Sequence, residues 1–96
     1  MNNNYCGIFK VTEENRLDPE GSETVIGRAI IEGPIDAAEA GAIIVRAVDS
    51  TRKGLRDMNF IMGVEIIEEL SSIPDNFRGV LPVYEDGDTK VWLINP

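Results

Sequence analysis

Apolar and polar residues alternate along two stretches near the N-terminus, residues 5–12 and 23–32. A period of two is typical of a β-strand with one face in the core, so we expect a strand over each stretch. Between them, residues 13–22 contain Asp18-Pro19 and Gly21, which favour turns and predict a loop. Two consecutive strands joined by one loop pair most naturally as an antiparallel hairpin.

The pattern changes to helical spacing after Gly33-Pro34. Asp36 is a typical N-cap residue, and Glu39 stands three positions later, as in a capping box. We therefore expect a helix over residues 36–53, ended by Gly54. Its predicted apolar stripe comprises Ala37, Ala40, Ile44, Ala47, Val48 and Thr51.

The middle of this helix carries no charge between Glu39 and Arg46. One small sheet covers a single stripe, so we expect this stretch to need a second cover, which a homodimer would supply. Basic residues gather toward the predicted C-terminus of the helix, which suits the helix macrodipole and predicts a dipolar molecule. They are Arg46, Arg52, Lys53 and Arg56.

Alternation returns over residues 58–69 and predicts a third strand, although residues 64–70 also fit a helix by period. Residues 71–79 have the composition of a loop. The chain closes with a predicted hairpin of residues 80–84 and 89–94 around Asp86-Gly87, a pair that favours tight turns.

Pro82 lies within the first strand of that hairpin and has no N–H to donate, so we expect an edge strand or an irregular one. The fold class predicted for residues 1–96 is a single α+β domain of order β-β-α-β-β-β. One helix packs on one face of a mostly antiparallel sheet. If the second and third strands are parallel, the helix between them forms a right-handed crossover.

Composition excludes several classes of function. The chain has 17 acidic and 9 basic residues, a formal charge of −8, no histidine and one cysteine. A negative surface disfavours direct binding to nucleic acid or to an anionic membrane, and it suits a partner with a basic surface. The longest apolar run, residues 40–45, is too short for a membrane span, and residues 1–4 do not begin a secretory signal. We therefore expect a cytoplasmic protein.

Catalytic chemistry finds few candidates. Without histidine, the commonest general base and metal ligand is missing. Cys6 lies in a predicted strand among apolar neighbours, which indicates a buried hydrophobe more than an activated thiolate. The carboxylates of Glu65, Glu68 and Glu69 lie close in sequence, with Glu65 and Glu69 expected on one face, and they would support acid–base chemistry only if one were desolvated.

Residues 85–89 place three carboxylates around Gly87, but an EF-hand loop needs a glutamate at its twelfth position, where Pro96 stands. A hairpin turn explains the same residues, so we expect no catalytic residue, no dedicated metal site and no cofactor. Tyr84 and Trp92 belong to this hairpin, either as a cross-strand pair or as an exposed interface anchor.

The remaining candidates are acidic residues at loops and strand ends. If the first and last hairpins share one edge of the sheet, their acids form a negative field that would steer a basic partner. The predicted partner-binding residues are Glu13, Glu14, Asp18, Glu20, Glu85, Asp86 and Asp88. The alternative is a solvated surface that also blocks edge-to-edge aggregation.

These observations favour a non-enzymatic protein–protein interaction module. Its sharpest form is an acidic inhibitor that occupies the basic surface of a nucleic-acid-binding protein, as a phage anti-defence or immunity-type protein would. The alternatives are a homodimeric structural or assembly protein without a ligand, and an enzyme that uses its carboxylates or a bound cation.

Overall fold

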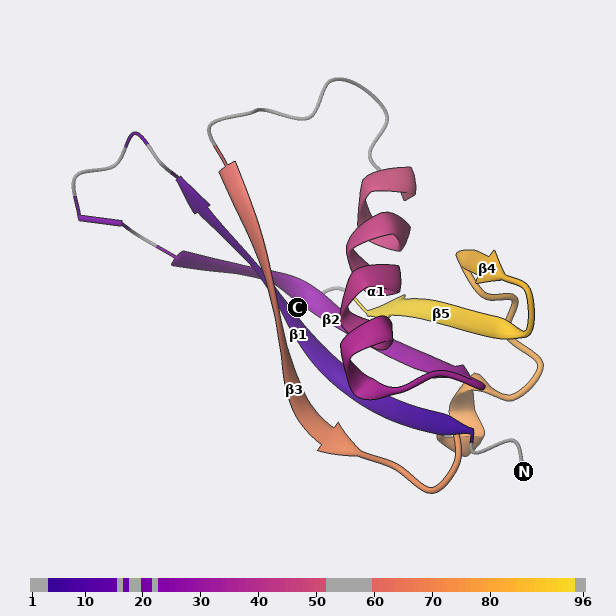
Figure 1. Ribbon diagram of the computed structural model, residues 1–96. Helices are drawn as coiled ribbons and strands as arrows, with labels where there is room; N and C mark the ends of the chain where they lie inside the picture. The colour runs from indigo at the N-terminus through magenta and orange to yellow at the C-terminus, as the bar shows by residue number, and fades with distance from the viewer. Residues whose placement is uncertain (1–3, 16, 18–19, 22, 52–59, 95–96) are drawn as a thin grey trace.

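The computed structural model describes residues 4–15, 17, 20–21, 23–51 and 60–94. It confirms an α+β fold of order β-β-α-β-β-β (Figure 1). Its elements are β1 (Tyr5–Asn15), β2 (Glu23–Gly33), α1 (Ala37–Thr51), β3 (Phe60–Glu69), the short 3-10 helix η1 (Asp75–Phe77), β4 (Tyr84–Asp86) and β5 (Thr89–Ile94).

The five strands form one sheet in the order β3-β1-β2-β5-β4, and every neighbouring pair is antiparallel. β2 and β3 both run antiparallel to β1, so they are parallel to each other with β1 between them. α1 connects β2 to β3 and packs across one face of the sheet, here called the helix face (Figure 1). The opposite side is the far face.

The first hairpin is longer than its apolar pattern predicts. Residues 13–15 were expected to be loop, but Glu13 and Glu14 continue the ladder opposite Thr24 and Glu23. The register shifts between Val11 and Thr12, which forms a β-bulge. The alternation of apolar residues stops at the bulge, so the sequence pattern does not indicate the last residue pairs of the ladder.

The core lies between α1 and the helix face. It consists of Phe9, Val11, Ala29, Ile31, Ala40, Ile43, Ile44, Ala47, Val48 and Val91. The predicted stripe was wrong at its ends, because Ala37 and Thr51 are exposed, and it omitted Ile43. Ile43 and Ile44 are buried within the single chain, whereas Val45 of the same uncharged stretch is half-buried.

The N-terminus of α1 is capped as predicted. The backbone N–H of Glu39 donates a hydrogen bond to Asp36 Oδ1 at 2.8 Å, which satisfies one of the free donors of the first turn. α1 ends at Thr51, and the predicted basic cluster of Arg52, Lys53 and Arg56 falls outside the described residues. The described part of the chain contains no helix long and apolar enough to cross a membrane.

β3 is a strand through Glu69, so the helical alternative for residues 64–70 is wrong. The last hairpin is shorter than predicted, because β4 begins at Tyr84 and leaves residues 80–83 outside the strand. This is the irregular edge that Pro82 predicts. The segment between β3 and β4, residues 70–83, runs along the far face (Figure 1).

A protein-binding surface as the candidate functional site

Among the described residues, three of the seven large apolar side chains that are exposed lie just before β4. Leu81 is 86% exposed, and Val80 and Val83 are each 47% exposed. We call Val80, Leu81 and Val83 the Leu81 ridge. Exposed single hydrophobic residues are ordinary, but three within four residues are unusual, and exposed apolar patches mark interaction sites.

The backbone of the Leu81 ridge is held at both ends. The N–H of Val80 donates to the carbonyl of Phe77 at 3.1 Å, and the N–H of Val83 donates to the carbonyl of Val91 at 2.9 Å. Between them, Pro82 has a fixed φ and removes one rotatable bond. Leu81 therefore projects from a segment whose backbone is held by hydrogen bonds on both sides.

A hydrogen bond from Trp92 holds the ridge at a third point. It is 4% exposed on β5, and its indole Nε1 donates to the carbonyl of Val80 at 2.9 Å. Val91 lies in the core under α1, so its neighbour Trp92 points to the far face, away from Tyr84, the cross-strand partner of Val91. The predicted Tyr84–Trp92 pair is therefore wrong. Trp92 is buried and hydrogen-bonded to the ridge, so it is not an exposed interface anchor either.

The predicted acids Glu85, Asp86 and Asp88 follow the ridge directly in the chain and are exposed. Part of their charge is balanced. Asp86 lies 3.5 Å from the guanidinium of Arg46, and Glu85 stands opposite Lys90 in the β4–β5 ladder. An apolar centre with a partly neutralised acidic rim is the usual organisation of a protein-binding surface.

A shallow groove of about 260 Å³ lies beside the ridge on the far face. Its walls include Ile73, Phe77 and Trp92, with Glu32 and Lys90 at its polar side. The groove has a mixed polar and apolar lining to which Val80 and Leu81 of the ridge also contribute.

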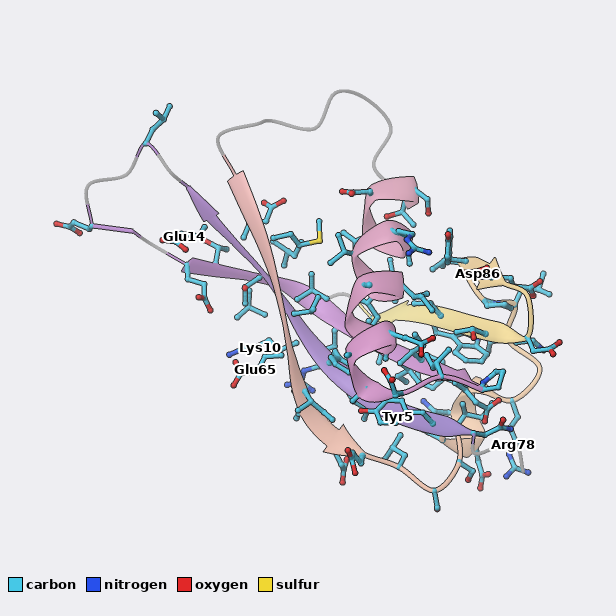
Figure 2. The ribbon with its side chains drawn as sticks, viewed as in Figure 1. Tyr5, Lys10, Glu14, Glu65, Arg78 and Asp86 are labelled. Atoms are coloured by element: carbon cyan, nitrogen blue, oxygen red, sulfur yellow. The ribbon has the colours of Figure 1, made fainter. Side chains whose placement is uncertain are left out.

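The other predicted acids lie at the opposite end of the sheet. Glu13, Glu14 and Glu20 belong to the first hairpin, and Asp18 falls outside the described residues. Along β2, Glu32, the partner of Lys90, lies nine positions after Glu23, the partner of Glu14. Nine steps span roughly 30 Å at ~3.3 Å per residue. Figure 2 shows Glu14 and Asp86 at the two ends. The structure therefore does not bring the two acidic groups together.

The hairpin end has an unfavourable charge arrangement of its own. Glu14 and Glu23 stand directly opposite each other in the β1–β2 ladder. Like charges at such positions destabilise a strand pair, so a basic side chain placed beside them would relieve a repulsion already present in the free protein.

The carboxylates considered for acid–base chemistry are divided between the two faces. A bulge in β3 between the partners of Ile8 and Phe9 pairs Glu65 with Lys10 but Glu69 with Gly7. Glu65 therefore points to the far face and Glu69 to the helix face, so the expectation of a shared face was wrong. Lys10 Nζ lies 3.2 Å from Glu65 Oε2, whose side chain is 72% exposed (Figure 2).

Cys6 is buried on the far face of β1. Burial, and to a lesser extent the nearby carboxylate of Glu32, raises the pKa of its thiol to about 11. A nucleophilic cysteine needs a lowered pKa, so the environment of Cys6 acts in the opposite direction and keeps the thiol protonated at neutral pH.

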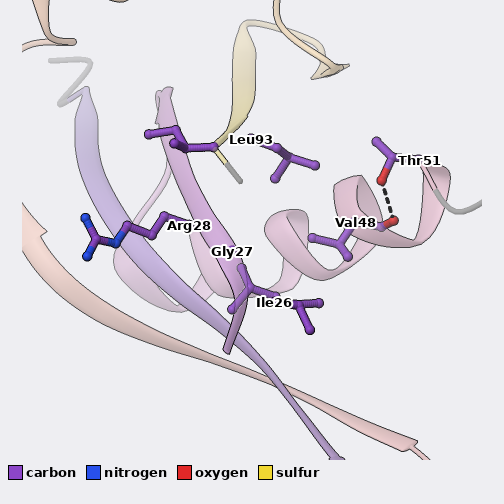
Figure 3. A pocket seen from close by; sticks show the side chains of 8 residues that line it. Ile26, Gly27, Arg28, Val48, Thr51 and Leu93 are labelled. Carbon is purple, nitrogen blue, oxygen red and sulfur yellow. Dashed lines mark hydrogen bonds between the residues drawn. The ribbon is translucent and has the colours of Figure 1, made fainter. Parts of the chain in front are cut away.

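A second cavity, of about 200 Å³, lies between the end of α1 and the bulged part of β2 (Figure 3). Apolar side chains such as Val11, Val48 and Leu93 form most of its lining. The hydroxyl of Thr51 already donates to the carbonyl of Val48 at 2.8 Å, and the guanidinium of Arg28 points away from the helix.

Among the described residues, no group of three or more His, Cys, Asp or Glu side chains is arranged to hold a metal ion. The chain matches no protein-family model, and it matches no curated protein and no solved structure. The fold and this surface define a small acidic α+β domain with an exposed apolar ridge whose backbone is held by hydrogen bonds.

Proposed function

We propose that this protein is a non-enzymatic protein–protein interaction module whose contact surface is the Leu81 ridge with its acidic rim. The observation that supports this most strongly is the 86% exposure of Leu81 on a segment whose backbone is hydrogen-bonded on both sides. An exposed leucine that is also fixed in place loses little conformational entropy on binding, so most of its burial contributes to affinity.

The free energy expected from burying Leu81 is consistent with a moderate, specific contact. Full burial of one leucine side chain contributes about 1.5–3 kcal/mol. Glu85 and Asp88 would add charge complementarity to a basic partner, which raises the association rate more than the affinity and weakens with salt.

In its sharpest form, the partner is a nucleic-acid-binding protein and this chain is its acidic inhibitor. The spacing of the acidic groups supports this form, because roughly 30 Å along β2 separates the two ends at ~3.3 Å per residue. A basic groove that binds a nucleic-acid backbone offers positive charge over such a length. Competition by DNA for the captured partner would test this form independently of the ridge.

Capture of partners from a cell lysate at low salt, compared between two matched variants, tests the proposal. Leu81→Ser removes the ridge, whereas Leu17→Ser changes an equally apolar residue, 70% exposed, in the first hairpin. We expect the wild type and Leu17→Ser to retain the same protein and Leu81→Ser to lose it. Equal retention by all three proteins would contradict the proposal.

Self-association is the alternative use of an apolar ridge. A symmetric contact between two copies of the ridge would also bring together two sets of Glu85, Asp86 and Asp88, which repel. We therefore expect a monomer in sedimentation velocity at micromolar concentration. A dimer that dissociates in Leu81→Ser would instead identify the ridge as a homodimer interface.

A further inference from the structure

We propose that the outer edge of β3 binds an extended, basic segment of a partner protein as a sixth strand of the sheet. The site is separate from the Leu81 ridge, because β3 and β4 form opposite edges of the five-stranded sheet. The inference rests on the length of this free edge, on what its side chains expose and on their charge.

The first observation is the edge itself. β3 runs for ten residues and pairs only with β1 among the described strands. Alternate N–H and C=O groups on the outer side of an edge strand have no ladder partner, and they form a template for an added strand. β4, the other edge, is only three residues long, so β3 offers the longer template.

The second observation is the exposed apolar surface on this strand. Ile66 is 42% exposed and Ile67 is 51% exposed. Ile66 pairs with Phe9, which places it on the helix face next to the core. Side chains of an added strand would lie ~4.5–5.5 Å from those of β3, so an apolar residue there would cover Ile66.

The third observation is the charge of the strand. Glu65 and Glu68 pair with Lys10 and Ile8 and so point to the far face. Lys10 balances Glu65, whereas within the described residues Glu68 and Glu69 form no ion pair. Glu69, paired with Gly7, points to the helix face. An added strand with lysine or arginine at alternate positions would place its cations on the far face beside Glu65 and Glu68, where opposite charges stabilise a cross-strand pair.

The same charges argue against a second copy of this chain as the occupant. An antiparallel register that brings Glu65 of one copy opposite Glu68 of the other places like charges together on the far face. Like charges at directly opposed positions are destabilising. These charges disfavour that pairing with a second copy and favour a strand of opposite charge; charged side chains on an edge strand are one way in which a protein avoids edge-to-edge aggregation.

The test uses the full chain and the synthetic peptide acetyl-(Lys-Val)₅-amide. The matched control is the same peptide with N-methyl groups on alternate residues, which keeps the charge and removes backbone donors. Backbone amide NMR shifts locate the binding site, and titration measures the dissociation constant. We expect shifts over β3 and β1, and a dissociation constant about ten-fold higher for the methylated peptide, since each lost backbone hydrogen bond costs part of the affinity.

Equal affinity of the two peptides, or shifts confined to β4 and β5, would overturn the proposal, because either result means adsorption by charge alone. Two charge-reversal variants give a second comparison. Glu68→Lys on β3 should weaken binding, whereas Asp88→Lys, which makes the same charge change in the β4–β5 turn, should not. Leu81→Ser should bind the peptide as the wild type does, so failure here leaves the proposal for the Leu81 ridge intact.

Discussion

The indole of Trp92 donates a hydrogen bond of 2.9 Å to the carbonyl of Val80, twelve residues earlier in the chain. This bond joins the buried side of β5 to the exposed segment that carries Leu81. It connects a buried side chain of the far face to the candidate binding surface, because Trp92 is 4% exposed while Leu81 is 86% exposed. Changes at Trp92 should therefore reach the surface.

The substitution Trp92→Phe tests this connection. It keeps a large apolar ring but removes the donor, which leaves the Val80 carbonyl without that partner. We expect the free energy of unfolding to fall by about 1–2 kcal/mol, the usual cost of a lost hydrogen bond plus some lost packing. Urea unfolding measures the loss, and partner capture should weaken as well. Leu81→Ser is the control, because it should abolish capture with little change in stability. Unchanged capture by Trp92→Phe would show that the hydrogen bond from Trp92 to Val80 does not position the ridge.

The fold was predictable because its signals are local. Phe9 and Val11 alternate with polar residues, and Asp36 caps a helix whose apolar stripe is continuous, so strands and helix follow from short windows of sequence. The two bulges were not predictable. Each inserts one residue into a ladder and depends on which strands pair, so the opposite faces of Glu65 and Glu69 could not be inferred from their spacing.

The candidate surface was predicted only in part. Glu85, Asp86 and Asp88 lie on it, but the first-hairpin acids do not, because the distance between the hairpins depends on strand order. Leu81 was overlooked because its apolar neighbours resemble a strand. The available signal was Pro82, which removes a ladder donor and excludes a regular strand at that point.

At Gly33, β2 lies so close to β5 that a side chain would not fit. A Cβ atom at this position would lie 2.7 Å from the Cα atom of Thr89 and closer still to its hydroxyl oxygen. Because the nearest obstacle includes backbone, a rotamer change cannot relieve the contact. We expect Gly33→Ala to lower the free energy of unfolding by about 3 kcal/mol, at the upper end of ordinary overpacking. Gly87→Ala is the control: nothing lies within 4 Å of its Cβ position, and its φ of 60° should cost only about 1 kcal/mol. Equal losses in urea unfolding would contradict this explanation.

Tyr5 and Gly7 should show a coupled response. The hydroxyl of Tyr5 is buried without a hydrogen-bond partner, and a Cβ on Gly7 would lie 2.9 Å from that oxygen. Tyr5→Phe removes an unsatisfied polar atom, so we expect stability to stay constant or rise by up to about 1 kcal/mol. Gly7→Ala should destabilise by about 1–2 kcal/mol in the wild type and by less in the Tyr5→Phe background. A double-mutant cycle with additive effects would show that the hydroxyl is not the obstacle.

The pKa of Cys6 predicts a loss of stability at high pH. Burial, with a smaller contribution from Glu32, raises the thiol pKa from 9.0 to about 11. Between these values the unfolded chain releases the thiol proton while the folded protein retains it. The folded state then binds more protons, so the free energy of unfolding must fall as pH rises from about 9 to about 11. Below pH 9 both states are protonated and Cys6 adds no pH dependence.

Urea unfolding at several pH values checks this prediction in the wild type and in Cys6→Ala. The variant should have a flatter dependence across that window, although its absolute stability is lower because a buried side chain is shortened. Tyr5, whose pKa burial and the charge of Glu69 also raise, acts in the same direction, so Tyr5→Phe is needed to separate the two groups. Iodoacetamide gives an independent measurement at pH 8, where the folded protein should react far more slowly than the urea-unfolded chain because its thiol is both buried and protonated. Parallel stability curves for wild type and Cys6→Ala, together with rapid alkylation of the folded protein, would mean that Cys6 is accessible to solvent and ionises normally.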